Sequence, residues 1–509
     1  MKRALSHRYM SDTEEVEMGK KYDAIIIGAG PGGVTCAALL AKRGLHVLVL
    51  DKNERVGGKQ MTASIKGYKG ELWPTGGMPM NGGSWIEAFR ALGIESKFRV
   101  SIKDMSNLYR RSGGEWLRTV THMDPYELPD PNILFDQWEL NAKERESALQ
   151  ILTEIALMPP DEINSLDDTT VREYLERYEV MPRRFYGYFA MLTHAFNVGL
   201  IDLVPMSEVV KTFQRLMGQP LGYPIGGYGR MSEDIAQVIK DCGSEIKTGT
   251  RVEKIIIEDG QATGVITRDA VFRAPIIVSN AGIQPTVLKL VDEQHFDKSY
   301  ISYVKSLLPS NGFTGCHYVL SKPVLEYGLY QIWSDDAWWD MDRQDQVKEG
   351  HMPADLVMTV LVPTNYDPEM GPPGKQLLVF GTPCSPNPAD ETIEALWKKT
   401  DQQMAEMFPE IVPFIESKGP YSGPAQVAAA SRDQVLPAQG GEACGLCVTI
   451  GQCGKYKPSA KSPITGLFYV GFDAGSTAFM GSQQAVDSGL RVAPLVHHYY
   501  LEKRQSSLG

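Results

Sequence analysis

The stretch that decides the fold is residues 22–51, which read YDAIIIGAGPGGVTCAALLAKRGLHVLVLD. Its parts follow one another as an apolar strand (residues 23–27), a glycine loop (28–33), a helix (about 32–43), a second apolar strand (46–50) and Asp51. Glycines so spaced between a strand and a helix, with a carboxylate about 20 positions further on, are typical of a dinucleotide-binding βαβ unit. The sequence therefore predicts an α/β protein with a Rossmann-like domain.

Each glycine of this loop has an expected purpose. Gly28 permits the tight turn, Gly30 lets the backbone approach a pyrophosphate, and Gly33 lets helix and strand pack closely. The helix N-terminus then offers unpaired N–H groups to phosphate charge. Asp51 is expected to accept hydrogen bonds from ribose hydroxyls. The predicted cofactor-binding residues of this unit are Gly28, Gly30, Gly32, Gly33 and Asp51.

A second pair of adjacent glycines follows Asp51, in Arg55-Val56-Gly57-Gly58-Lys59. Two glycines let backbone amides come close to a ligand, and a basic side chain beside them can balance pyrophosphate charge. A plain surface turn is the alternative. The residues predicted here as cofactor-binding are Lys52, Arg55, Gly57, Gly58 and Lys59.

Residues 51–58 resemble the Asp/Glu-x-x-x-Arg-x-Gly-Gly signature of the glutathione-reductase-type flavoproteins, among them amine oxidases, protoporphyrinogen oxidase and phytoene desaturases. Residues 223–230, 252–255, 278–281 and 372–375 resemble the phytoene-desaturase branch of that superfamily. The resemblance runs from about Tyr22 to Tyr500 and implies FAD as the cofactor. It also implies that the backbone of Val252 meets the adenine, and it places Asn280 at the cofactor site.

Near the C-terminus, residues 466–473 resemble the second FAD signature of these enzymes, in which a strand delivers a carboxylate to the ribityl chain. The resemblance implies this role for Asp473, although Phe472 separates it from Gly471, and the two are usually adjacent in the family. The helix expected from Gly481 is implied to direct its positive end at flavin N1 and the C2 oxygen, which would stabilise anionic reduced flavin. The predicted cofactor-binding residues at its start are Gly481, Ser482 and Gln483.

These segments predict two domains built from alternating parts of the chain. The FAD-binding domain is expected to comprise residues 21–98, 223–280 and 463–509, and the α+β substrate-binding domain residues 99–222 and 281–462. Residues 1–20 are charged and carry no apolar run, so we expect a disordered tail and no secretory signal. We also expect a helix at residues 231–241 and strands at residues 250–257, 262–267, 274–279 and 466–471.

Composition narrows the class of protein. With 43% hydrophobic and 22% charged residues, the 509-residue chain can bury a large core. The net charge of −11 gives no reason to expect a nucleic-acid partner. No apolar run is long enough to span a membrane, which leaves peripheral membrane contact open. Seven scattered cysteines fit a reducing cytoplasm better than a secreted disulfide framework.

Candidate catalytic residues are Tyr223, Tyr228 and His194. The two tyrosines flank a double-glycine loop that lies near the active site in the resembled family, so they could line that site or act as acid and base. His194 has an apolar context in which a structural histidine is more common than a catalyst. His317 is likewise more often structural than catalytic. Trp333, Trp338 and Trp339 could belong to the hydrophobic core or line a pocket. Residues 206–217 could form an apolar entrance or a buried face.

Cys444, Cys447 and Cys453 suggest a metal or dithiol site, but the sequence offers no fourth ligand nearby. Small residues packing near the cofactor are the favoured interpretation, and no metal is predicted.

The leading functional hypothesis is an FAD-dependent dehydrogenase or desaturase that forms a C=C bond in an apolar isoprenoid or alicyclic substrate. The alternatives are a flavin amine oxidase and, from another class, a flavin-retaining isomerase or nonenzymatic relative. Because no second glycine fingerprint follows a strand, no NAD(P)H domain is expected. Electrons are then expected to leave to oxygen, a quinone or a carrier protein, and a homodimer stays open.

Overall fold

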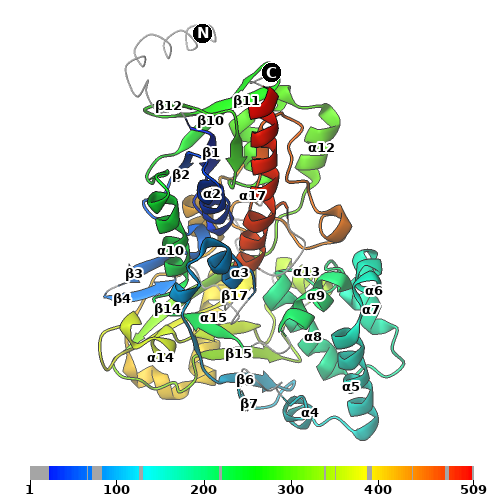
Figure 1. The fold of residues 1–509 in the computed structure, drawn as a ribbon. Coiled ribbons are helices and arrows are strands. Elements are labelled where there is room, and N and C mark those ends of the chain that lie inside the picture. Colours follow the sequence, from blue (N-terminus) through cyan, green and yellow to red (C-terminus); the bar gives the residue numbers. More distant parts are fainter. Residues whose placement is uncertain are drawn as a thin grey trace.

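A five-stranded parallel sheet forms around the glycine loop (Figure 1). The computed structural model describes residues 22–65, 67–71, 83–124, 130–216, 220–337, 340–349, 351–386, 393–437, 439–475 and 481–506. The strands, in sheet order, are β19 (Leu467–Tyr469), β13 (Ile277–Ser279), β1 (Ala24–Ile27), β2 (Val47–Leu50) and β9 (Glu245–Lys247). Strands β1 and β2 are apolar throughout because both faces of this parallel sheet are covered.

Helices cover one face of the sheet. Helix α2 (Pro31–Lys42) lies against α17 (Gly481–Ser506) and α10 (Tyr228–Asp241), and α17 also contacts α3 (Gly83–Leu92). Ala24 and Ile26 of β1 share a core with these helices. The alternate residues Ile25 and Ile27 pack on the other face, against a three-stranded antiparallel sheet. That sheet consists of β10 (Val252–Glu258), β11 (Gln261–Thr267) and β12 (Val271–Arg273).

A mixed seven-stranded sheet forms the lower part of the molecule in Figure 1. Its strands, in sheet order, are β18 (Ile415–Lys418), β14 (Gly312–Leu320), β17 (Gln376–Cys384), β16 (Met358–Leu361), β15 (Leu329–Ser334), β6 (Met105–Arg110) and β7 (Trp116–Thr121). Only the β15–β6 pair is parallel among the described pairings of this sheet. Helix α15 (Ile393–Met407) packs Leu396 and Met404 onto one face.

A group of helices packs beside this sheet. They are α4 (Asn132–Gln137), α5 (Ala142–Leu157), α6 (Pro160–Ser165), α7 (Val171–Glu176), α8 (Arg183–Asn197) and α9 (Met206–Leu216). Capping boxes fix two helix starts, Asn141 with Glu144 and Thr170 with Glu173. Val209 and Val210 of α9 belong to a core shared with the sheet residue Trp333. Over its described residues, 206–216, the apolar stretch predicted at 206–217 therefore forms a buried face.

Shorter elements connect these layers. They are β3 (Thr62–Ile65), β4 (Tyr68–Glu71), β5 (Val100–Ile102), β8 (Gly222–Pro224), α11 (Ile283–Pro285), the π-helix η4 (Thr286–Val291), α12 (Lys298–Ser306), α13 (Met341–Lys348), α14 (Pro363–Tyr366), α16 (Pro424–Ala430) and several short 3₁₀ turns, including η1 (Gly58–Gln60).

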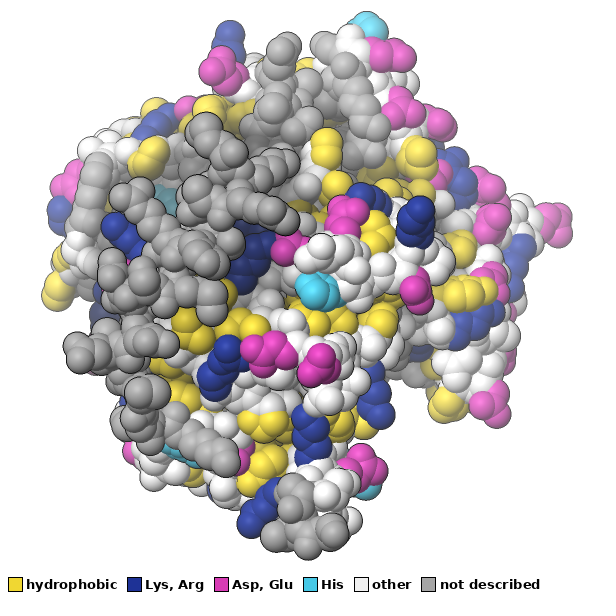
Figure 2. Space-filling model, turned by 90° about the horizontal axis from the view of Figure 1, so that it is seen from above, with side chains coloured by type: hydrophobic (Ala, Val, Ile, Leu, Met, Phe, Trp, Pro, Cys, Tyr) yellow, Lys and Arg dark blue, Asp and Glu magenta, His cyan; other side chains and the backbone are white. Residues whose placement is uncertain are grey.

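The α/β class and each expected strand and helix are confirmed, with ends that shift by a few residues; α10 begins at Tyr228 rather than at 231. Among the described helices, none combines the length and apolar character needed to cross a membrane. On the described part of the face seen in Figure 2, basic and acidic side chains are interspersed and neither sign dominates.

The first turn of α2 yields a stability prediction. A Cβ at Gly33 would lie 2.0 Å from the Gly28 carbonyl oxygen, so Gly33→Ala forces the backbone to move. This substitution should lower the free energy of unfolding by about 3 kcal/mol, at the upper end for an overpacked site. Gly44→Ala is the control, because Gly44 has φ +87° but no atom within 4 Å, so only the roughly 1 kcal/mol of left-handed strain applies. Denaturant unfolding that gives equal losses for both variants would contradict the steric account.

Candidate functional site

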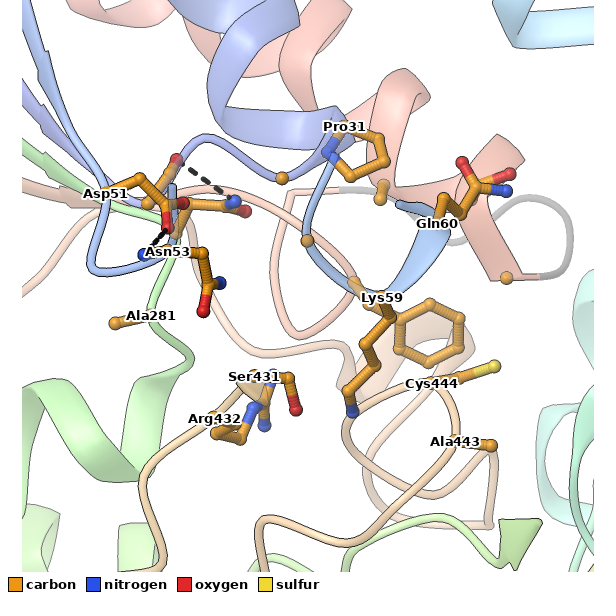
Figure 3. Close-up of a pocket in the computed structure, with 18 of the residues that line it drawn as sticks. Pro31, Asp51, Asn53, Lys59, Gln60, Ala281, Ser431, Arg432, Ala443 and Cys444 are labelled. Atoms are coloured by element: carbon orange, nitrogen blue, oxygen red, sulfur yellow. Dashed lines mark hydrogen bonds between the residues drawn. The ribbon is translucent and has the colours of Figure 1, made fainter. Parts of the chain in front are cut away.

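A cavity of about 310 Å³ opens at the carboxyl ends of the parallel strands, where the glycine loop meets the other sheet (Figure 3). Ligands of open α/β sheets bind at such an edge. Of the residues predicted as cofactor-binding, those that line the cavity are Gly28, Gly30, Asp51, Lys52, Gly58, Lys59, Val252, Asn280, Gly481, Ser482 and Gln483. The structure thus brings together residues from five separate stretches of the sequence.

The start of α2 faces the cavity without a capping side chain. Gly30 is the N-cap and Pro31 occupies the first turn, and among the described residues no side chain caps the first N–H groups. A Cβ at Gly30 would lie 2.9 Å from the side-chain nitrogen of Asn280, which itself donates a hydrogen bond to the Gly28 carbonyl. The open N–H groups and the helix dipole provide an anion site, as a pyrophosphate requires.

Asp51, directly after β2, connects the glycine loop to the end of that strand by a hydrogen bond. Its carboxylate accepts hydrogen bonds from the backbone N–H of Ala29 (2.6 Å) and of Asn53 (2.8 Å). Burial raises the pKa of Asp51, and these hydrogen bonds oppose the shift. The carboxylate lines the cavity, where it fits the predicted contact with ribose hydroxyls.

The second glycine pair lies directly against the first loop. The N–H of Gly57 donates to the Ala29 carbonyl at 2.9 Å, and a Cβ at Gly58 would lie 3.2 Å from Cα of Gly30. Lys59 extends into the cavity, and its ammonium bonds the carbonyl of Glu442. Arg55, in contrast, is exposed, bonds the Thr62 carbonyl and does not line the cavity. Of the two basic candidates in this motif, the structure therefore places only Lys59 at the cavity.

Three more predicted glycines support the loop without lining the cavity. Gly32 and Gly33 pack into the first turn of α2, where a Cβ on Gly32 would lie 2.8 Å from the Ala485 carbonyl oxygen and the Gly471 Cα. Gly57 is buried with φ +110°. These residues shape the loop through the closeness of their backbone contacts.

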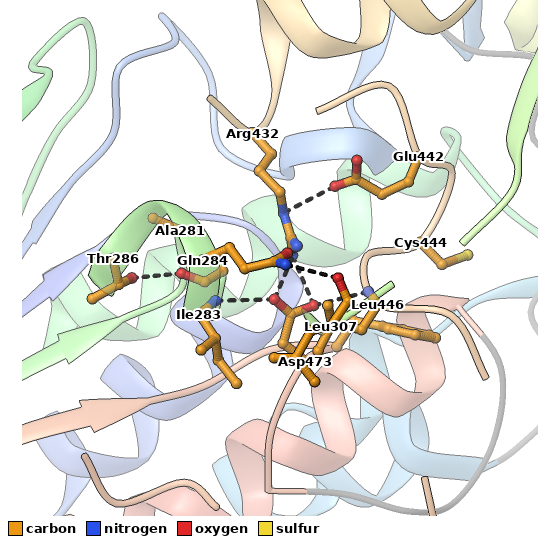
Figure 4. Close-up of polar contacts among 12 residues, drawn as sticks. Ala281, Ile283, Gln284, Thr286, Leu307, Arg432, Glu442, Cys444, Leu446 and Asp473 are labelled. Carbon is orange, nitrogen blue, oxygen red and sulfur yellow. Dashed lines mark hydrogen bonds and ion pairs between the residues drawn. The ribbon is translucent and has the colours of Figure 1, made fainter. Parts of the chain in front are cut away.

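Asp473 is buried beside the cavity, and its implied contact with the ribityl chain remains a prediction. Its carboxylate is 2% exposed and does not line the cavity. It accepts hydrogen bonds from the N–H groups of Ile283 and Leu446 and is held by the Arg432 guanidinium at 2.9 Å (Figure 4). Phe472, the extra residue of the motif, lines the cavity. The Asp473 carboxylate forms a buried ion pair with Arg432.

The start of α17 is fixed by α3. The indole N–H of Trp85 donates to the Ser482 hydroxyl at 3.1 Å, and its backbone N–H donates to the Gln483 side chain at 3.2 Å. Trp85 is fully buried, so the helix start has a rigid support. Residues 476–480, just before it, lie outside the described residues.

The three candidate catalytic residues occupy different places. Tyr228 and His194 line the cavity, whereas Tyr223 is fully buried behind Tyr228. The two tyrosine rings meet edge to face at 5.4 Å. Burial raises the pKa of both phenols well above the usual value, with the Glu71 carboxylate as a second cause, and lowers the pKa of His194 to about 4. His194 also lies 3.2 Å from the Asn311 side chain through Nε2.

Glu71 supports both tyrosines and was not predicted. It is 2% exposed, and its carboxylate accepts hydrogen bonds from the Tyr223 hydroxyl (2.6 Å) and the Tyr228 N–H (3.1 Å). It thereby sits at the N-terminus of α10, whose dipole favours negative charge. Burial nevertheless raises the pKa of Glu71 to about 7. No local motif marks this residue, since the two tyrosines that it supports are more than 150 positions away.

The cysteines of the 444–453 segment are free thiols. Burial raises the pKa of Cys444 to about 11 and of Cys447 to about 12. Thiols with such pKa values stay protonated at neutral pH and are poor nucleophiles or metal ligands. Cys444 lines the cavity, in agreement with small residues packing near the cofactor. Of the three tryptophans, Trp333 is in the core, and Trp338 and Trp339 lie outside the described residues.

The chain has relatives among flavoenzymes and carotenoid enzymes. The prolycopene isomerase of Daucus carota is 24% identical over 455 residues, covering 80% of this chain and 69% of the relative. The phytoene desaturase of Cercospora nicotianae is 23% identical over 409 residues, covering 72% of this chain and 61% of the relative. The crystal structure of an oxidoreductase from Methanosarcina mazei superposes with a TM-score of 0.69 at 20% identity, over 92% of this chain and 99% of that one.

The model of the family "flavin containing amine oxidoreductase" matches residues 31–497. Flavin also fits the structure, because the uncapped helix start, the closely packed Gly30 and Gly58, and Asp51 lie in one cavity. The chain therefore belongs to the family of flavin-containing amine oxidoreductases, and its cofactor is FAD.

Proposed function

We propose that the protein is an FAD-dependent dehydrogenase that forms a C=C bond in an apolar isoprenoid or alicyclic substrate. The observation that carries this proposal is the uncharged part of the cavity wall. That part comes from the end of α8 and from the seven-stranded sheet, and it comprises His194, Ala195, Phe196, Val198, Phe313 and Thr359. Among the described lining residues, the only carboxylates are Asp51 and Asp433, which belong to the nucleotide-binding end of the cavity.

This distribution favours an apolar substrate over an amine. A protonated amine loses hydration when it enters a cavity and needs a counter-charge there. The described wall beside α8 supplies none, because it contains no carboxylate. Phe196, Val198 and Phe313 instead offer apolar surface of the kind that binds a hydrocarbon.

The chain's own residues would bind the substrate and control protons at this wall. Bound FAD supplies a two-electron acceptor that takes a hydride from a substrate C–H bond. The Tyr228 phenol stays protonated at neutral pH, so it can act as a hydrogen-bond donor or general acid toward a substrate oxygen. Forming the C=C bond also releases a proton from the adjacent carbon, and the neutral ring of His194 on the cavity wall can accept it. Tyr223 and Glu71 hold Tyr228 in place from behind. The apolar residues exclude water from the reacting carbon.

A second candidate is a flavin-retaining isomerase. It is favoured by the similarity to the prolycopene isomerase of Daucus carota, which covers 80% of this chain. The similarity to the phytoene desaturase of Cercospora nicotianae favours the dehydrogenase instead. If the protein is a dehydrogenase, we propose that oxygen, a quinone or a carrier protein receives the electrons.

The proposal predicts which compounds reduce the flavin. Purified protein should be yellow, and anaerobic mixing with carotenoid precursors or cyclic ketones should bleach the visible flavin band, whereas amines should not. Bleaching by amines alone would overturn the proposal in favour of an amine oxidase. A carotenoid that is isomerised with no net change in flavin colour would support the isomerase.

Tyr228 can be tested with a neighbouring tyrosine as control. Tyr228→Phe keeps the ring but removes the hydroxyl, and it should slow anaerobic bleaching by the substrate about 100-fold, as loss of an acid–base group does. Tyr223→Phe leaves the cavity wall intact and should slow bleaching by less than about 10-fold. An unchanged rate in Tyr228→Phe would remove this residue from the chemistry.

Glu71 predicts a specific pH dependence of stability. Its pKa rises from 4.5 to about 7 on folding, so the folded state binds the proton more tightly. The resulting stabilisation is complete below pH 4.5 and is lost as pH rises through about 7. Glu71→Gln has no titrating group here and does not lose stability in this way. As pH rises from 5 to 8, the melting temperature of Glu71→Gln should therefore increase relative to that of the wild type. Glu95→Gln, at an exposed ion pair with Arg90, is the control. A constant difference between Glu71→Gln and wild type would refute the shift.

A further inference from the structure

A short strap, residues 431–433, separates the FAD cavity from a shallow groove on the surface. All three strap residues line the cavity, and Asp433 lines the groove as well. Lys52 and Arg251 also border both spaces, whereas Lys289 borders only the groove. The wall between cavity and solvent at this point is therefore the contact between Asp433 and the cations around it.

Asp433 joins the strap to three separate segments. Its carboxylate lies 3.2 Å from Nζ of Lys52, which follows β2, and 2.8 Å from the guanidinium of Arg251, which precedes β10. It lies 2.6 Å from Nζ of Lys289 on η4. These cations hold the pKa of Asp433 well below its usual range. One carboxylate thus pairs with three positive side chains, and these ion pairs close the cavity wall at this point.

The neighbouring Arg432 anchors the strap from the inside. Its guanidinium pairs with Asp473 at 2.9 Å and with Glu442 at 3.1 Å, and both carboxylates are at most 2% exposed. A Cβ at Gly282 would lie only 2.6 Å from the guanidinium carbon, so this side chain is tightly enclosed. Breaking a buried pair of this kind is costly, so the strap stays attached here.

The outer contact is the weaker of the two. The side chains of Arg251 and Lys289 are 46% and 47% exposed, and ion pairs at such positions are weak and screened by salt. Opening would therefore begin at Asp433, and it would join the cavity to the groove beside Asp51, where the nucleotide end of FAD is expected.

We propose that Asp433 with Lys52, Arg251 and Lys289 forms a gate through which FAD enters and leaves. In this proposal the side chain of Arg432 holds the strap in place on its inner side. The gate acts on the rate of cofactor exchange. It is independent of which substrate the flavin oxidises.

Lys289→Met tests the gate most cleanly, because Lys289 pairs with Asp433 but does not line the cavity. After dilution of the holoprotein at low salt, FAD fluorescence should appear about two- to fivefold faster than in the wild type, as expected for one exposed ion pair. Asp433→Asn, which weakens all three pairs, should release FAD faster still. Salt should accelerate release from the wild type more than from either variant.

Equilibrium binding separates a gate from an ordinary binding contact. A gate changes entry and exit together, so the fraction of FAD bound at equilibrium should stay the same in Lys289→Met. The control is Lys375→Met, whose pair with Glu416 has similar exposure and does not touch the cavity; its release rate should equal that of the wild type. Wild-type release rates and salt dependence in both gate variants would overturn the proposal. So would a loss of equilibrium binding that matches the faster release.

Discussion

The structure depends on one close approach that only glycine permits, at the first turn of α2. A Cβ at Gly33 would collide with the Gly28 carbonyl, and a Cβ at Gly32 would collide with Gly471 and with the Ala485 carbonyl. Gly489 of α17 approaches the same turn, since its Cβ would lie 2.7 Å from Thr35. Segments more than 400 positions apart therefore meet at one point. The open end of α2 and the cavity in front of it result from this contact.

The two ends of the cavity differ in electrostatic character. The end at which we expect the nucleotide carries Asp51, Lys52, Arg251 and Asp433, and it begins at the positive end of a helix. Its other end is formed by apolar side chains and the neutral His194. A polyanionic cofactor and an apolar substrate can share such a cavity without competing for the same groups. Arg432 lines the cavity, and its guanidinium pairs with the buried carboxylates of Asp473 and Glu442 (Figure 4).

Local patterns in the sequence predicted the elements around the cofactor, because a glycine loop, its flanking strands and the following carboxylate are adjacent in the chain. The surroundings of Asp473 could not be predicted in this way. Its motif is recognisable, but its ion-pair partner Arg432 is 41 positions away and no local spacing marks that contact. Glu71 and the strap at 431–433 act through contacts between distant segments, and no residue spacing reveals those contacts. The division into two domains and the individual binding roles remain predictions.

The most direct test of this account is a crystal structure of the protein with FAD bound. We predict that the pyrophosphate lies at the N-terminus of α2 beside Gly30, that Asp51 contacts the adenosine ribose, and that the ring system faces Tyr228 and His194. The apolar wall would then remain for the substrate. A ring system placed at Asp433, with the adenine against α8, would contradict the account, because the reactive end would then face the charged gate.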